Sequence, residues 1–207
     1  KMKRIARDVS KKTGKEFDFI IRGEDTEIDK TMVDALSDPL LHLIRNAIDH
    51  GLESSQEREK LGKNIGTVTL EAYHRGNNVV IEISDNGKGI DSNAILEKAI
   101  SRGLVTQPHH LDESEIINFI FDPGFSMAKE ISDISGRGVG LDVVKNSIDK
   151  LKGKIDIKTE LGEGSSFKII LPLTLAIIDG MIISISDEIF ILPTLSVVES
   201  FSPDMSQ

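Results

Sequence analysis

Cysteine and tryptophan are absent from this chain of 207 residues, and tyrosine occurs once. Without cysteine the protein can form neither a disulfide framework nor a zinc site with thiolate ligands, which agrees with a reducing compartment. Apolar runs of about 20 residues, the length that a membrane-spanning helix needs, are also absent, and the first residues, Lys-Met-Lys-Arg, lack the apolar segment of a signal peptide. We therefore expect a soluble, cytoplasmic protein that does not insert into a membrane.

Basic residues are in short supply, because 25 Lys and Arg stand against 34 Asp and Glu and leave a net charge of −9. Sequence-independent binding to nucleic acid relies on clustered positive charge, so we expect no nucleic-acid partner. An anionic ligand would have to be attracted locally. A bound Mg²⁺ or the backbone N–H groups at the start of a helix are the usual means.

Hydrophobic residues make up 39% of the chain, which is enough for one sizeable core. Pro172 marks a change in composition, because the residues that follow are rich in isoleucine. A segment as short as 174–207 cannot bury its own apolar faces. We expect one domain over 1–173, followed at 174–207 by the start of a second, truncated domain or by an extra piece packed on the first.

The spacing of apolar residues predicts alternating helices and strands. Helices are expected over 1–12, from 29 or 30 to 50 with a kink or break at Asp38-Pro39, and over 54–62, 93–102, 113–121 and 141–151. A strand is expected over 16–22, and hairpins from 66–74 with 78–84, 154–159 with 166–171, and 175–185 with 188–192. Gly51 is expected to end the long helix as a C′ residue. Residues 122–135 have no strong period and are a candidate mobile loop.

The stretch Leu40–Gly51 carries the sharpest clue to function. At 100° per residue its polar side chains fall within an arc of about 140° and its apolar side chains lie opposite. The polar set consists of His42, Arg45, Asn46, Asp49 and His50. These residue types serve as ligands, proton-transfer groups and phosphate contacts. Two simpler explanations stay open, since His50 could cap the helix through its dipole and Asp49 could pair with Arg45.

Two glycine-bearing clusters, Asp85–Ile90 and Gly136–Gly140, lie after a predicted strand and before a predicted helix. The Asp85 carboxylate could accept a hydrogen bond from the amino group of adenine, while Gly87 and Gly89 leave room for the base. Backbone amides at the start of the helix could hold phosphate. The spacing fits neither a Walker A loop nor a Rossmann fingerprint, and a tight turn and a flexible loop are the alternatives.

Taken in order, four stretches resemble the N, G1, F and G2 boxes of the GHKL superfamily of ATPases and kinases: 42–49, 85–89, 121–125 and 136–140. Within it, His-Leu-Ile-Arg-Asn-Ala-Ile-Asp-His-Gly and Ser-Gly-Arg-Gly-Val-Gly-Leu-Asp-Val-Val resemble the chemotaxis histidine kinases, the CheA-like family. Hydrolytic relatives typically place Glu four residues before the metal-binding Asn, whereas His42 stands there in this chain. The family usually continues Gly-Phe-Ser-Thr after the F box, but this chain has Met127 in place of the Thr.

The resemblance implies a two-layer α/β sandwich of the GHKL (Bergerat) type, with a mixed, mostly antiparallel sheet, helices on one face and a short β tail. It implies that ATP and Mg²⁺ bind between the helices and a lid, with His42, Arg45 and Asn46 as catalytic residues and Asn46 as the metal ligand. Asp85 would bind the adenine amino group. The nucleotide-binding residues that it implies are Asn46, Asp49, His50, Asp85, Gly87, Lys88, Gly89, Ile90, Ser126, Gly136, Arg137, Gly138, Val139, Gly140 and Leu141.

The resemblance also implies a protein histidine kinase of two-component signalling, which passes the γ-phosphate of ATP to a His on a separate phosphotransfer domain. Residues 1–173 would be its catalytic domain, and 174–207 the truncated start of a CheW-like regulatory domain that contacts a CheW-like adaptor and a receptor array. We expect no autophosphorylation by this chain alone, and dimerisation only through segments outside it. Two alternatives stay open: a non-catalytic signalling scaffold switched by nucleotide, and a GHKL ATP hydrolase.

Overall fold

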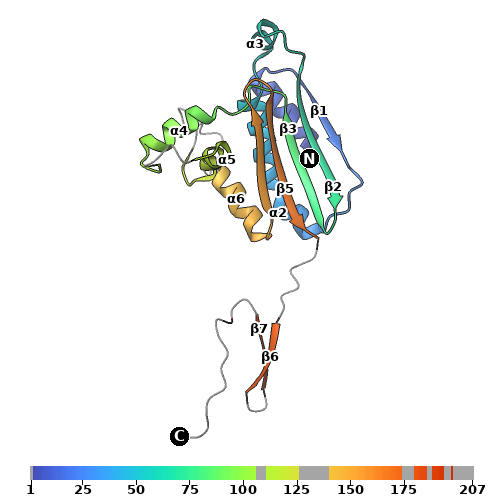
Figure 1. Cartoon of the computed structure of the whole chain (residues 1–207). Coiled ribbons are helices and arrows are strands. Elements are labelled where there is room, and N and C mark those ends of the chain that lie inside the picture. The colour runs from blue at the N-terminus through green and yellow to red at the C-terminus, as the bar shows by residue number, and fades with distance from the viewer. Residues whose placement is uncertain are drawn as a thin grey trace. The chain divides into compact units, whose positions relative to one another are not determined.

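The computed structural model describes residues 2–105, 111–125, 140–173, 180–185, 188–193 and 197. The chain divides into two units, Lys1–Leu173 and Thr174–Gln207. The first unit is a two-layer α/β structure in which helices pack on a five-stranded sheet, as Figure 1 shows for its described residues. The predicted fold class, a mixed sheet covered by helices, is confirmed.

The sheet runs in the order β1-β2-β3-β5-β4. Its strands are β1 (Phe17–Arg22), β2 (Gly66–Arg75), β3 (Asn78–Asp85), β4 (Lys154–Glu160) and β5 (Gly164–Pro172). Among the described strand pairs of this sheet, β1–β2 is parallel, and β2–β3, β3–β5 and β4–β5 are antiparallel. Sequence periodicity therefore located each of these strands to within a few residues.

The helices of the first unit also follow the predicted segments. They are α1 (Met2–Thr13), α2 (Lys30–Asn46), the π-helical turn η1 (Ala47–Gly51), α3 (Ser55–Lys60), α4 (Ser92–Ser101), α5 (Glu113–Asn118), the 3₁₀ turn η3 (Phe119–Phe121) and α6 (Leu141–Lys150). Side chains cap the starts of α2 and α4, where Asp29 accepts from the Thr31 amide and Asp91 from the Asn93 amide. Both Ser54 and Asp112 form capping boxes.

Pro39 does not break α2, because the helix runs on through it to Asn46; of the expected kink or break, the break is absent. A proline inside a helix removes one backbone hydrogen bond and crowds the preceding turn. Here the proline is buried beside Leu36, Leu40 and Leu43, which are also buried. Tertiary packing of this apolar face outweighs the local preference.

The core lies between the sheet and the helices. Its largest fully buried side chains include Leu43, Ile44 and Ile48 from α2 and η1, Ile95 from α4, Ile148 from α6, and Val68, Ile83, Ile169 and Leu171 from the strands. On the other face of the sheet Glu82 and Lys168 form an ion pair of 3.0 Å and stay about a quarter exposed. The sheet therefore buries one face, as its alternating sequence predicts.

The second unit contains an antiparallel hairpin of β6 (Gly180–Ile185) and β7 (Glu188–Pro193), in which Ile182 pairs with Ile191. The predicted hairpin is present from Gly180 onward, and residues 174–179 lie outside the described part. The candidate mobile loop at 122–135 also lies outside it after Phe125. None of the helices that the structure describes is both long and apolar enough to cross a membrane.

Candidate functional site

The polar face of the long helix ends in a change of helix type. His42, Arg45 and Asn46 lie on α2 and are half-buried, whereas Asp49 and His50 lie in η1 and are exposed. The Leu52 amide donates to the Ala47 carbonyl at 2.9 Å, which is the i to i+5 bond of a π-turn. Single π-turns inside helices are frequent at functional sites.

His42 stands among other charged groups of this face. Burial lowers its pKa, the Arg45 and His50 side chains lower it further, and Asp142 of α6 acts in the opposite direction. The imidazole is therefore neutral at pH 7 and can accept a proton or a hydrogen bond. The same electrostatic neighbours show that the structure brings His42, Arg45 and His50 together and places the start of α6 beside them.

Gly51 does not end the helix in the predicted way. It is the last residue of η1, and it does not belong to the residues with positive φ, so it is not a left-handed C′ residue. Instead the chain leaves through Leu52 in an extended conformation. A Cβ on Gly51 would stand 3.0 Å from Oδ2 of Asp85, so this glycine allows a close approach rather than a turn.

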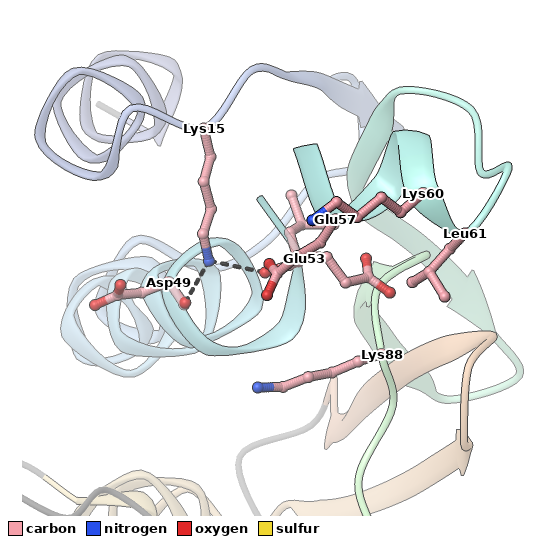
Figure 2. A pocket seen from close by; sticks show the side chains of 8 residues that line it. Lys15, Asp49, Glu53, Glu57, Lys60, Leu61 and Lys88 are labelled. Carbon is pink, nitrogen blue, oxygen red and sulfur yellow. Dashed lines mark hydrogen bonds between the residues drawn. The ribbon is translucent and has the colours of Figure 1, made fainter. Parts of the chain in front are cut away.

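Lys15 satisfies the carbonyls at the end of η1. Its Nζ donates to the carbonyl oxygens of Ile48 at 3.1 Å, Asp49 at 2.6 Å and Leu52 at 2.7 Å. Figure 2 shows this side chain reaching from the segment after α1 to the helix end. A cation is favoured there by the exposed carbonyls and by the helix dipole. Sequence reasoning missed Lys15, because nothing local links it to a helix more than thirty residues away.

Asp85 ends β3 and begins the G1 loop. The Gly87 amide donates to its Oδ1 at 2.9 Å. Burial raises the pKa of Asp85 to about 6, although hydrogen bonds from the amides of Gly87 and Ser165 oppose the shift. At pH 7 the carboxylate is mostly ionised and partly withdrawn from water, which suits an acceptor for an amino group.

The two glycines of this loop are required by the protein itself. A Cβ on Gly87 would stand 2.1 Å from the Gly51 carbonyl oxygen, and one on Gly89 would stand 2.2 Å from the carbonyl oxygen of Glu160. The Lys88 amide donates to the Gly51 carbonyl at 3.0 Å, so the loop is bonded directly to the end of η1. Backbone approach thus explains both glycines, and a contact of either with a base stays a prediction.

The remaining predicted residues divide between described and undescribed parts. Lys88 is exposed, and the Ile90 amide donates to Oγ1 of Thr159 at 2.9 Å. Gly140 and Leu141 form the start of α6, where Gly140 is the N-cap residue and provides no side-chain bond. The others, Ser126, Gly136, Arg137, Gly138 and Val139, lie outside the described residues.

A pocket of about 380 Å³ adjoins this arrangement (Figure 2). It is lined by Lys15, Asp49, Leu52, Glu53, Glu57, Lys60, Leu61 and Lys88. Two predicted nucleotide residues, Asp49 and Lys88, border it, but His42, Asn46 and Asp85 do not. The pocket therefore lies beside the polar face of α2, on the side of α3.

Comparison with known proteins assigns the class. Residues 35–175 match the family model described as histidine kinase-, DNA gyrase B-, and HSP90-like ATPase. The chain belongs to this family of ATPases. The histidine kinase domain of the Erythrobacter litoralis EL346 blue-light activated histidine kinase has a similar fold, with a TM-score of 0.50, 13% identity, and coverage of 83% of this chain and 63% of that one.

Within the family, the chain is CheA-like along its length. It is 47% identical over 207 residues to the chemotaxis protein CheA of Rhizobium meliloti (strain 1021), which is 100% of this chain and 27% of that protein. It is 48% identical over 200 residues to the chemotaxis protein CheA of Bacillus subtilis (strain 168), covering 95% of this chain and 30% of the relative. The chain thus spans less than a third of the length of these relatives.

Proposed function

We propose that this chain is the ATP-binding catalytic core of a chemotaxis histidine kinase, which transfers the γ-phosphate of ATP to a His on a separate phosphotransfer domain. The observation that carries the proposal is the hydrogen bond of 3.0 Å between the Lys88 amide and the Gly51 carbonyl. It joins the Asp85 loop to the polar helix, so that groups suited to a base and groups suited to phosphates belong to one site.

In this site the Asp85 carboxylate accepts a hydrogen bond from the amino group of adenine. The helix face with His42, Arg45 and Asn46 binds the triphosphate. The first-turn amides of α6, at Leu141 and Asp142, are of the kind that a helix leaves free for an anion. His42, held neutral, orients the transferred group or accepts a proton near it. Asp49, His50, Lys88 and the G2 residues 136–140 complete the proposed contacts.

Asn46 would hold Mg²⁺, because its amide oxygen is a hard ligand and the residue lies half-buried on the helix face that carries His42 and Arg45. When bound, the ion would neutralise phosphate charge. The protein then contributes mainly position, since phosphoryl transfer needs little covalent chemistry from side chains.

The similarity to CheA proteins supports a wider role. We assign residues 1–173 to the catalytic domain and 174–207 to the start of a CheW-like regulatory domain, through which a CheW-like adaptor and a receptor array would be reached. A cytoplasmic location and dimerisation through segments outside this chain belong to the same proposal. The histidine kinase domain of the Erythrobacter litoralis protein supports the fold alone.

The test is transfer in trans. The chain is incubated with γ-labelled ATP, Mg²⁺ and a purified phosphotransfer domain from a CheA protein, and labelled phosphohistidine is counted on that domain. A kinase core labels the domain and leaves the chain itself unlabelled. Phosphate release at the same rate with and without the acceptor would instead indicate a hydrolase. Nucleotide binding without transfer or release would indicate a scaffold.

A further inference from the structure

Three charged side chains form a buried cluster beneath the loop that carries Asp85. Glu53 and Arg58 expose only 7% and 5% of their side chains, and Lys63 exposes 22%. Arg58 Nη1 lies 2.6 Å from one carboxylate oxygen of Glu53, and Lys63 Nζ lies 2.6 Å from the other. We refer to Glu53, Arg58 and Lys63 as the charge cluster.

Both cations of the charge cluster also bind the backbone of the loop. Arg58 Nη1 donates to the carbonyl of Asn86 at 3.1 Å, and Lys63 Nζ donates to the carbonyl of Gly87 at 2.9 Å. The cluster therefore holds two successive peptide groups immediately after Asp85.

Each of these peptide groups is fixed at both ends. In a planar trans peptide the C=O and the N–H point in opposite directions. The peptide group between Asn86 and Gly87 accepts from Arg58 at its C=O and donates to the Asp85 carboxylate at its N–H, at 2.9 Å. Arg58 is thus connected to the Asp85 carboxylate through a single rigid plane.

The next peptide group repeats the arrangement. Its C=O, on Gly87, accepts from Lys63, and its N–H, on Lys88, donates to the Gly51 carbonyl at the end of η1 at 3.0 Å. A Cβ on Gly87 could not be accommodated at 2.1 Å from the Gly51 oxygen, so the loop has little freedom to shift toward α2. Together the two peptide planes fix the loop backbone from which the Gly87 amide holds the Asp85 carboxylate.

The anion of the charge cluster stays ionised. Burial alone would raise the pKa of Glu53, but the hydrogen bond from Lys63 and the charges of Lys63 and Arg58 outweigh it and leave the pKa lowered. A buried ion pair is in itself weak evidence for stability, because desolvation offsets most of the attraction. The role of these ion pairs is to orient the cations, because the one carboxylate of Glu53 holds both Arg58 and Lys63 toward the adjacent carbonyls of the loop.

We propose that Glu53, Arg58 and Lys63 are positioning residues for recognition of the base: they hold the Asn86–Lys88 backbone so that the Asp85 carboxylate meets the amino group of adenine. The inference rests on the proposed function, because it names the residues that give the same site its preference for an adenine nucleotide. None of the three needs to touch the nucleotide.

The experiment compares ADP, GDP and inorganic tripolyphosphate, each with Mg²⁺, by calorimetric titration of the whole chain. The variants are Lys63→Met, which keeps the aliphatic stem, and Arg58→Lys, which keeps the charge but loses the planar fork. Lys150→Met is the matched control, because Lys150 is an exposed lysine in the last turn of α6, at the opposite end from the proposed phosphate contacts. Circular dichroism confirms that each variant is folded.

Lys63→Met and Arg58→Lys are expected to lower the ADP-to-GDP affinity ratio by roughly tenfold, about the effect of losing one charge-assisted hydrogen bond. Tripolyphosphate affinity is expected to stay within about twofold, since the phosphate contacts lie elsewhere. In an Asp85→Asn background Lys63→Met should leave the ratio unchanged, because the cluster acts through Asp85. Lys150→Met should behave as the unaltered chain.

An unchanged ratio in folded Lys63→Met would overturn the inference and assign the cluster to stability alone. The same conclusion follows if the affinities for ADP and for tripolyphosphate fall by the same factor. If Arg58→Lys does not fold, Lys63→Met decides the question by itself, because its side chain is the more exposed of the two. An unaltered chain that fails to bind ADP would overturn the proposed function, and the inference with it.

Discussion

Burial of Asp85 suits the recognition of an amino group but disfavours the ionised form of its carboxylate. Its carboxylate must be partly withdrawn from water to recognise an amino group, and that withdrawal raises its pKa from 3.8 to about 6. A group whose folded pKa lies above its unfolded pKa binds more protons in the native state. The Asp85 ionisation therefore costs stability at neutral and higher pH, and this cost falls as the pH drops through 6 toward 4.

Asp85→Asn should stabilise the nucleotide-free chain at pH 8 by up to about 3 kcal/mol, because a shift of about 2 pKa units no longer opposes folding. The gain should shrink to roughly half at pH 5. Urea unfolding at the two pH values measures it, with the exposed Asp149→Asn as the control. A loss of stability at both pH values would contradict the assigned environment of Asp85.

The affinity for adenosine should depend on the ionisation of the same Asp85 carboxylate. Only the ionised form accepts from the amino group without competition, so adenosine affinity should fall by roughly tenfold between pH 7 and pH 5, as the carboxylate protonates through its pKa of about 6. Adenosine is the probe because it carries no phosphate that titrates in this range. In Asp85→Asn the affinity for adenosine should be low and nearly independent of pH. An equal pH dependence of the affinity in the two proteins would assign the titration to another group.

Asn46 is the single described residue that we assign to the metal. Asn46→Ala should reduce labelling of a separate phosphotransfer domain to background and remove the Mg²⁺ dependence of ATP binding, because the amide oxygen that would hold the ion is lost. The matched control is Asn146→Ala, which removes an exposed amide from α6. Undiminished transfer by Asn46→Ala would refute the metal role.

At the scale of elements, the end of η1 depends on a residue from a distant segment. Three carbonyls there accept from Lys15 Nζ, and the loop beyond Asp85 bonds to the Gly51 carbonyl of the same turn. The helix end is therefore shared by the N-terminal segment and the G1 loop. A substitution of Lys15 should therefore alter nucleotide binding, because it would disturb the turn that carries Asp49 and His50.

Lys15→Met should lower the free energy of unfolding by about 1 to 3 kcal/mol, because the part-buried carbonyls of Ile48 and Leu52 lose a charged donor. It should also weaken ADP binding. Denaturant unfolding and calorimetry measure the two effects, and Lys12→Met, an exposed lysine at the end of α1, serves as the control. Equal stability of the two variants would show that the carbonyls find other partners, such as water.

Local sequence patterns predicted the helices and strands well, but they predicted the helix ends and connections poorly. The helices, strands and hairpins follow from apolar period and turn chemistry, which act over a few residues. The π-turn, the unbroken helix at Pro39 and the extended exit after Gly51 depend on packing against distant segments. Contacts of this kind leave no local trace in a single sequence.

The site shows the same division. The motifs indicated Asp85 and Asn46 as candidate residues, since their types and order are informative. They could not indicate Lys15, Arg58 or Lys63, because a lysine or arginine in a charged segment is usually a solvated side chain. For Gly87 and Gly89 the motif was informative, but the structure gives a different physical reason, namely backbone approach to Gly51 and Glu160.

At the scale of the molecule, a chain with net charge −9 must bind a polyanion by local means. The α6 N-terminus, the cationic side chain of Arg45 and a Mg²⁺ ion on Asn46 would supply them, within the unit Lys1–Leu173. The described residues that we assign to the site all belong to the first unit. Nucleotide binding should therefore be a property of the first unit.

The most direct test of this account is a titration of the isotopically labelled chain with Mg²⁺-ADP, followed by the backbone amide signals in NMR spectra. The amides of Asn46, Gly87 and Leu141 should shift together and saturate at one dissociation constant, while those of Gly76 in the β2–β3 turn and Ile182 in β6 should stay in place. Shifts confined to the β6–β7 hairpin, or the absence of any shift at Asn46 and Gly87, would contradict a nucleotide site between α2 and the loop that follows β3.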